Sequence, residues 1–409
     1  MKPALIQPCV PSAEMKWLCA CASPVRSGAL VEEAFQGRPV DGSRLRTLAM
    51  NHHVVPLVYQ ALKGVARKTS AVIPAEFLAC FHRDYMAIAA HNLRAMATLH
   101  RLQRLMEANG IRLVPIKGPA LALLAYGSPS MRQFEDLDLI VRREDLLRAV
   151  GLLEQEGYAP REIPLAASRT RYLASLQDWS LHKPGETLHL DLKPVLISHA
   201  LSGPRTADFM AQSCRPLAMD GGLSLLAPGP EAMLLAVCLD GANEMWGKLS
   251  SVADAGRLLT AFPGADWAGL LREASRFGQK RSLLVGAHLA VILLDCPLPE
   301  AFQPEARQDA AARRLAGKAA KQMLAETSLR TGMVWQSQFA YRTRERTRDR
   351  WRFLSRLLFV PGAMELNQIV LPDVFYPLYS CMRPFRLAWD ALRGRRPRRI
   401  AWAAGTRRP

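Results

Sequence analysis

Apolar residues recur three and four positions apart through most of the first hundred residues. The clearest case runs from Phe77 to Met106, between Pro74 and the pair Asn109-Gly110. This spacing places apolar side chains on one face of a helix, and Pro and Gly commonly mark helix ends. The pattern therefore predicts helices from about residue 25 to residue 108.

The pattern changes character after residue 110. Residues 111–116 and 136–141 are short apolar runs typical of strands, and the helical patterns 120–126 and 142–155 follow them. Residues 172–181 and 187–197 predict a hairpin around Lys183-Pro184-Gly185-Glu186. A further strand is expected at 223–226, and a helical pattern then continues to about residue 329.

This order of elements predicts an α+β fold, in which a small mixed sheet forms a core flanked by N-terminal and C-terminal helical regions. We expect an N-terminal helical region over residues 1–94, the core over 95–228, a helical domain over 229–330, and an Arg-rich amphipathic C-terminal segment with a disordered end over 331–409.

Composition agrees with a globular protein and adds one asymmetry of charge. Of 409 residues, 49% are apolar and 22% charged, which excludes global disorder and a collagen-like chain. The formal net charge is +18, yet residues 331–409 hold 16 Arg, no Lys and five acids, so +11 of it lies there. The basic character therefore belongs mainly to the C-terminal segment and not to the predicted core.

The basic segment has three interpretations. Its alternating arginines between residues 342 and 356 spread around a helix, which fits an ordinary solvated face. An anionic membrane surface or a nucleic-acid backbone would also suit them. We favour the membrane surface over nucleic acid, because the runs 357–360 and 375–379 are more apolar than phosphate binding requires.

Cysteine usage and hydropathy indicate the compartment. The eight cysteines form no CxxC pair and no cluster with His, which disfavours a disulfide framework or a zinc site. The first thirty residues lack a signal-peptide pattern, and no apolar run reaches 18 residues. We expect a bacterial cytoplasmic protein, peripheral to the inner face of the membrane if the basic segment binds lipid.

Two acids stand out on the strand predicted at 136–141. Asp136 and Asp138 are two residues apart, so both side chains leave one face while Leu137 and Leu139 face the core. Adjacent carboxylates repel unless a cation lies between them, and Mg²⁺ prefers such oxygen ligands. Two solvated acids at a strand start are the simpler alternative.

Other residues add context to this pair. Lys117 and Gly118 lie at a predicted strand-to-helix junction, where backbone N–H groups and the helix dipole favour phosphate. Asp191 alternates with leucines on a later strand and can face the first two acids, which would complete a ligand set for two metal ions. Arg132, in the connecting loop, can pair with a phosphate.

These motifs, in their order and spacing, resemble the uncharacterised nucleotidyltransferase family of the DNA polymerase β superfamily. The resemblance is carried by the run 113–121 with its Lys-Gly loop, then Tyr126, Arg132, the strand 136–141, the helix ending at Gly157-Tyr158 and the later carboxylate strand 190–192. It continues through residues 234–259, 266–267, 297–299 and 371–384, and so spans most of the chain from about residue 30. Gly127-Ser128 also fits the superfamily's glycine-serine signature superficially, but no strand precedes it.

The resemblance implies a nucleotidyltransferase fold and an activity of the EC 2.7.7 type. Asp136, Asp138 and Asp191 would be catalytic and hold Mg²⁺, two ions being expected. Lys117, Gly118 and Arg132 would bind a nucleoside triphosphate, with ATP the expected one. The acceptor would be a sugar, a lipid-linked sugar, a peptide or a protein, in polysaccharide or peptide natural-product biosynthesis.

The chain departs from the family pattern at three positions. Lys193 stands where the family usually has a histidine after the third carboxylate, and Asp240 and Asn243 stand where it often has a histidine pair. Two hypotheses follow. The first is transfer of a nucleoside monophosphate to an acceptor hydroxyl or phosphate. The second is a catalytically inactive nucleotide-binding or scaffold protein on a membrane surface or a protein partner.

Overall fold

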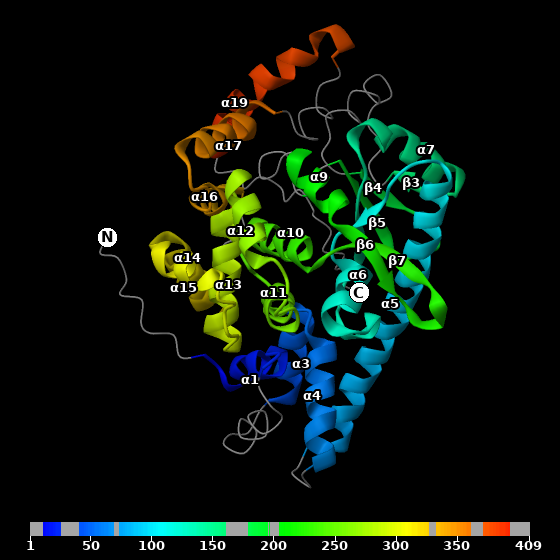
Figure 1. Ribbon diagram of the computed structural model, residues 1–409, viewed down its shortest axis with the longest axis vertical. Coiled ribbons are helices and arrows are strands. Elements are labelled where there is room, and N and C mark those ends of the chain that lie inside the picture. Colours follow the sequence, from blue (N-terminus) through cyan, green and yellow to red (C-terminus); the bar gives the residue numbers. More distant parts are fainter. Residues whose placement is uncertain are drawn as a thin grey trace.

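The computed structural model describes residues 11–25, 41–68, 73–160, 179–194, 196, 204–326, 333–360 and 371–392. The first arm of the predicted hairpin before residue 179 and the predicted disordered end after residue 392 lie outside these residues. A central sheet is placed between N-terminal and C-terminal helices (Figure 1). The predicted α+β class is therefore confirmed.

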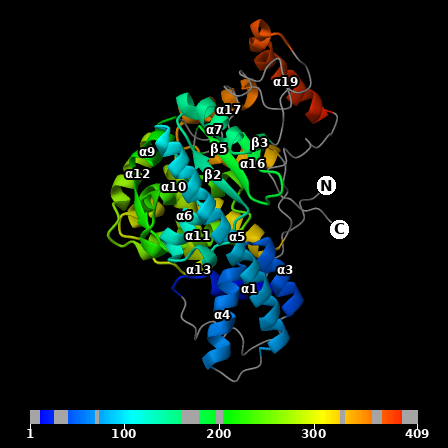
Figure 2. The ribbon, with the colours of Figure 1, turned by 90° about the vertical axis from the view of Figure 1, so that its right-hand side faces the viewer.

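The first three N-terminal helices form a group at one end of the molecule, in blue in Figure 2, and a long fourth helix extends from this group toward the sheet. They are α1 (Ala13–Ala22), α3 (Gly42–Asn51), α4 (Val55–Lys68) and α5 (Ala75–Ala108). The long helix α5 has 34 residues, and it packs against α4 and also against the β-region of the fold. It begins after Pro74 and ends at Asn109, as the sequence pattern predicts. Helix α5 thereby joins the N-terminal group to the sheet.

The central sheet has five strands in the order β1-β2-β5-β4-β3. Their bounds are β1 (Val114–Pro115), β2 (Asp136–Ile140), β3 (Ala159–Pro160), β4 (Trp179–His182) and β5 (His189–Lys193). Strands β2 and β5 are parallel, whereas the other three pairs are antiparallel. The elements between these strands are α6 (Gly118–Tyr126), η1 (Pro129–Met131), η2 (Arg143–Asp145) and α7 (Leu146–Gln155).

One face of the sheet is buried and apolar. Leu137 and Leu139 of β2 and Leu190 and Leu192 of β5 are at most 1% exposed. They share a hydrophobic cluster with residues of α5 and α7. Because successive residues of a strand point to opposite faces, the acidic residues between these leucines are placed on the other face, as the sequence predicts.

A second, two-stranded sheet follows α9 (Pro204–Gln212). It pairs β6 (Cys214–Ala218) with β7 (Ser224–Pro228), with η4 (Asp220–Gly222) between them. The sequence indicates β7 but not β6, because Pro216 interrupts a strand whose side chains are mostly exposed and lack clear alternation. Gln103 of α5 holds β7 in place: its side-chain amide accepts from Leu226 N–H and donates to Leu226 O.

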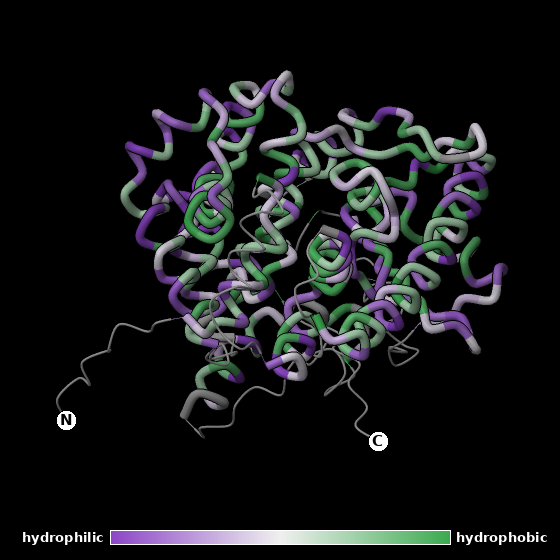
Figure 3. The backbone as a smooth tube through the Cα atoms, turned by 90° about the horizontal axis from the view of Figure 1, so that it is seen from below, coloured by the Kyte–Doolittle hydropathy of each residue, from purple (hydrophilic) through white to green (hydrophobic). Residues whose placement is uncertain are grey.

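Helices pack against the remaining side of the core. They are α10 (Pro230–Asn243), α11 (Leu249–Ala261), α12 (Trp267–Arg276), α13 (Lys280–Leu294), α14 (Phe302–Gln308) and α15 (Ala310–Leu324). Trp246 is 1% exposed and lies against Gly241 of α10 and Gly286 of α13. In Figure 3, hydrophobic and hydrophilic segments alternate along the helical turns of the molecule. Because Gly241 and Gly286 have no side chains, the Trp246 ring can approach the backbones of α10 and α13 closely.

The C-terminal elements lie along one edge of the molecule, in orange and red in Figure 1. They are α16 (Met333–Arg342), α17 (Thr347–Phe359), η5 (Asp373–Phe375) and α19 (Tyr376–Leu392). Helix α16 packs against α10, and α17 packs against both α16 and α19. Among the described residues, no helix is long and apolar enough to cross a membrane.

The packing around Trp246 yields a stability prediction. A Cβ added at Gly286 would lie 2.6 Å from Cys238 Sγ and 2.7 Å from the Trp246 ring. We expect Gly286→Ala to lower the free energy of unfolding by about 1–3 kcal/mol through overpacking. The matched control is Gly317→Ala in α15, where a Cβ meets nothing within 4 Å and the change should stabilise by about 0.5–1 kcal/mol. Denaturant unfolding of both variants tests this, and equal stabilities would contradict it.

Candidate functional site

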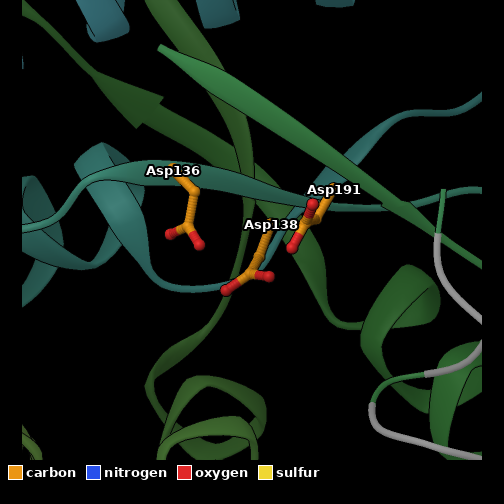
Figure 4. A group of neighbouring side chains, drawn as sticks. All are labelled: Asp136, Asp138 and Asp191. Carbon is orange, nitrogen blue, oxygen red and sulfur yellow. The ribbon is translucent and has the colours of Figure 1, made fainter. Parts of the chain in front are cut away.

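Three carboxylates converge on the polar face of the sheet. Asp136 and Asp138 extend from β2 and Asp191 from β5, all to the same side (Figure 4). The parallel register places Asp138 directly beside Asp191. One carboxylate oxygen from each of the three residues lies within 4.8 Å of the others. The structure thus brings together the three acids that the sequence singles out.

Two of the three acids, Asp136 and Asp191, have raised pKa values. Burial, followed by the neighbouring charge of Asp138, raises the pKa of Asp136 to about 7. Burial also raises the pKa of Asp191, whose Oδ1 accepts a 2.6 Å hydrogen bond from Ser180 Oγ on β4. Burial is therefore the main cause of both shifts, and the charge of Asp138 adds to it.

Two lysines balance the third acid, Asp138. Lys193 Nζ donates to its Oδ1 at 2.5 Å, and Lys117 Nζ lies 2.9 Å from its Oδ2. Burial opposes ionisation of Asp138, but these two ammonium groups outweigh burial and lower its pKa. Asp138 is 7% exposed and Lys193 9% exposed, so the ion pair is shielded from water.

The loop that carries Lys117 has an unusual backbone. Lys117 has a φ of 72°, in the region that favours glycine, and Gly118 follows it with a φ of 49°. These angles turn the chain from β1 into α6 in two residues, with Lys117 at the N-cap of the helix. A positive φ at a lysine costs conformational energy. Such a backbone conformation persists where the surrounding structure fixes it, often at functional sites. The turn directs the lysine ammonium back to Asp138.

Helix α10 contributes a further acid to the same site. Lys117 Nζ lies 2.9 Å from Asp240 Oδ2 as well as from Asp138. Burial opposes its charge, but the surrounding carboxylates, led by Asp138 and Asp240, raise the pKa of Lys117 well above its usual value. Glu244, one turn after Asp240, has a pKa raised by burial and by Asp240. One lysine therefore connects the sheet to the helical region.

Arg132, in the loop that precedes β2, forms an ion pair with a residue of α11. Its Nε lies 2.9 Å from Asp254 Oδ2 of α11, and Tyr126 OH donates to Asp254 Oδ1 at 2.7 Å. The guanidinium and the carboxylate are nearly buried, with 11% and 1% of each side chain exposed. In this structure Arg132 therefore holds α11 against the loop that precedes β2. Its nucleotide-binding role stays a prediction.

The donor set at the three carboxylates fits a divalent cation such as Mg²⁺. All ligands are hard oxygens, and the pKa of Asp136 is raised first by burial and then by the negative charge of Asp138, which a cation would counter. Asp138 is not freely available to a cation, because each of its oxygens is already paired with a lysine. A cation that uses Asp138 must displace or share these ammonium groups, which flexible lysine stems permit.

Sequence reasoning did not assign a role to Lys193, Asp240 or Ser180. Lys193 was detectable, because it follows Asp191 by two residues on one strand and so shares its face. Ser180 was not, since its row with Asp138 and Asp191 depends on the pairing of β4 with β5. Asp240 reaches Lys117 only through the packing of α10.

Comparisons with known proteins show what the chain is similar to. A family described as "Uncharacterised nucleotidyltransferase" matches residues 38–295. Among solved structures, the antibiotic-resistance factor ANT(2'')-Ia is 16% identical, with 45% of this chain and 92% of that chain covered and a TM-score of 0.32. An antigenic nucleotidyltransferase-like protein from Paracoccidioides brasiliensis is 15% identical, with 46% and 90% covered and a TM-score of 0.29. No curated protein matches the chain.

The two lysines on Asp138 predict how the site responds to metal. Replacing Lys193 by methionine keeps the stem but removes an ammonium group that competes for Asp138 Oδ1. We expect the Lys193→Met variant to bind Mg²⁺ about tenfold more tightly than the unmodified protein, which corresponds to ~1.4 kcal/mol of binding free energy. Calorimetric titration measures this affinity. Lys63→Met, in α4 beside Tyr59, serves as the control and should leave the affinity unchanged. Equal or weaker binding by Lys193→Met would contradict the competition.

The buried pair between Arg132 and Asp254 predicts a stability effect. Asp254→Asn leaves a buried guanidinium without its counter-charge, so we expect a loss of roughly 3 kcal/mol in the free energy of unfolding. Glu273→Gln is the control, because its pair with Arg276 is exposed and should be worth less than about 1 kcal/mol. Urea unfolding compares the two, and similar midpoints would show that the buried pair has no special weight.

Proposed function

The chain belongs to the family of uncharacterised nucleotidyltransferases, and from this premise we propose that it transfers a nucleoside monophosphate from a triphosphate to an acceptor hydroxyl or phosphate. The observation that carries the proposal is the row of carboxylates on two parallel strands beside a lysine at a helix N-terminus. ATP is the proposed triphosphate, and a sugar, a lipid-linked sugar, a peptide or a protein is the proposed acceptor.

The loop at Lys117 and Gly118 would bind the triphosphate. Gly118 has a φ of 49°, a backbone conformation that residues with a Cβ rarely adopt, so the turn into α6 favours glycine at this position. The first turn of α6 offers N–H groups that a helix does not use internally, and the helix dipole favours negative charge there. Lys117, already held at the junction by Asp138 and Asp240, supplies the nearest positive charge.

The acidic side of the site would organise the acceptor. Mg²⁺ held by Asp136, Asp138 and Asp191 would polarise the triphosphate and make the acceptor oxygen more acidic. Asp191, whose Oδ1 accepts a hydrogen bond from Ser180 on β4, would accept the proton of the acceptor hydroxyl. The new bond joins the acceptor oxygen to the α-phosphorus as the bond to the β-phosphate oxygen breaks, and pyrophosphate leaves in line.

Removal of two carboxylates tests this function. We expect the double variant Asp136→Asn with Asp138→Asn to lose at least about 100-fold in transfer from α-labelled ATP, because charge stabilisation at the phosphate is lost. The assay mixes the protein, Mg²⁺ and a bacterial extract that supplies acceptors. Glu135→Gln is the control, since Glu135 is the adjacent acid and its side chain is 58% exposed. Labelling that persists undiminished in the double variant would sink the proposal.

The second candidate is a protein that binds nucleotide without turnover. The observation in its favour is that both oxygens of Asp138 are paired with lysines, an arrangement that opposes a metal ion. Calorimetry with ATP and Mg²⁺ on the unmodified protein separates the two functions when it is combined with the transfer assay. Tight binding with no labelled acceptor and no pyrophosphate release would favour the second candidate.

A further inference from the structure

The outer face of α17 is apolar where a surface helix is normally polar. Trp351 is 72% exposed, Leu358 38% and Phe359 52%. These positions are seven and eight residues apart, which places them on one side of the helix. Arg348 and Arg352 are exposed on that side as well, whereas Phe353, on the inner side, is buried. The helix therefore packs through one aromatic face and presents another to solvent.

Helix α19 and the turn before it repeat this arrangement. Val374 is 82% exposed, Leu378 46%, Phe385 78% and Trp389 54%. Their spacing of four, seven and four residues follows one side of a helix. Tyr379 lies on the other side, is 1% exposed and accepts a hydrogen bond from Leu371 N–H. The apolar stripe of α19 is thus a property of a helix whose opposite side is already packed.

The two helices are joined to each other and extend from the body. Arg383 Nε donates to Leu357 O at 2.9 Å, which ties α19 to α17. Both helices lie at the periphery, and α19 projects beyond the other helices in Figures 1 and 2. Within the described part of the chain, every exposed Phe and Trp lies between residues 351 and 389. Among the described residues, exposed Phe and Trp side chains are therefore confined to α17, α19 and the turn before α19.

Charge indicates what would cover these faces. Residues 331–409 carry 16 Arg, no Lys and five acids. Arginines alone are enough to bind a polyanion, and such binding does not explain the exposed Val, Leu and Trp side chains. An anionic bilayer surface presents both phosphates for the arginines and an apolar layer for these side chains. Trp and Phe suit the headgroup boundary, and arginine stems can keep their charges at the phosphates.

We propose that α17 and α19 form an interfacial anchor, defined here by the exposed residues Trp351, Leu358, Phe359, Val374, Leu378, Phe385 and Trp389, that lies on an anionic bilayer surface. This interaction goes beyond nucleotidyl transfer and does not depend on it, because none of the anchor residues belongs to the carboxylate site. In this arrangement α17 and α19 lie in the plane of the bilayer surface, and the arginines of this segment contact the lipid phosphates.

Flotation of the full-length protein with vesicles tests the anchor. We expect binding to vesicles of phosphatidylcholine mixed with phosphatidylglycerol and little binding to phosphatidylcholine alone. Trp351→Gln with Phe385→Gln should reduce partitioning about tenfold, since exposed aromatic area is lost. Met86→Gln with Leu93→Gln is the control, because both side chains are more than half exposed on α5 and should leave binding unchanged. Thermal melting of each variant verifies that it is folded.

A second pair of variants separates lipid from other partners. Arg348→Gln with Arg352→Gln should weaken binding to the anionic vesicles, whereas Arg272→Gln with Arg276→Gln in α12 should not. If the aromatic variants bind as the unmodified protein does while the arginine variants fail, the surface binds polyanions such as nucleic acid and the anchor is wrong. Concentration-dependent dimerisation that the aromatic variants abolish, without vesicle binding, would instead assign the face to a second copy.

Discussion

The site depends on the in-register parallel pairing of β2 with β5. That pairing sets Asp138 beside Asp191 and leaves Asp136 two residues away on the same face. Leucines on the opposite face fix the register, because a slip by one residue would turn the acids into the apolar cluster under α5 and α7. The apolar core therefore enforces an electrostatic conflict, in which three carboxylates lie within a few ångströms of one another, and the surrounding charges respond to it.

Lys117 makes that response extend beyond the sheet. Its ammonium group lies 2.9 Å from Asp138 on β2 and 2.9 Å from Asp240 on α10, so the charge balance of the site depends on how the helical region is seated. The pair of Arg132 with Asp254 fixes the same region at a second point, through α11. Two buried ion pairs thus hold the helices against the acidic face, and a ligand that drew Lys117 away from Asp240 would loosen one of them while leaving the other intact.

The sequence predicted those parts of the fold that depend on local alternation. The strand 136–141 and the carboxylate strand were predictable because leucines and acids alternate there. The glycine turn indicated the helix predicted over 120–126, which in the structure begins at Gly118. The partners of Arg132 and Lys117 were not visible, because Asp254 lies 122 residues from Arg132 and Asp240 lies on a helix whose packing no local pattern encodes. The division of the chain after residue 228 stays a prediction, as do the individual roles of the site residues.

Lys193 changes how this site can bind a cation. A histidine at this position would be largely neutral near pH 7 and would leave Asp138 available as a metal ligand, whereas a lysine beside a buried carboxylate keeps its charge and occupies Asp138 Oδ1. A cation that uses Asp138 must therefore displace or share an ammonium group of an internal salt bridge. Because breaking a buried pair is costly unless the released charge finds a new partner, a triphosphate that accepts the freed ammonium groups would make metal and nucleotide binding mutually supportive. The same lysines that oppose a lone metal ion would then favour the metal and the nucleotide together.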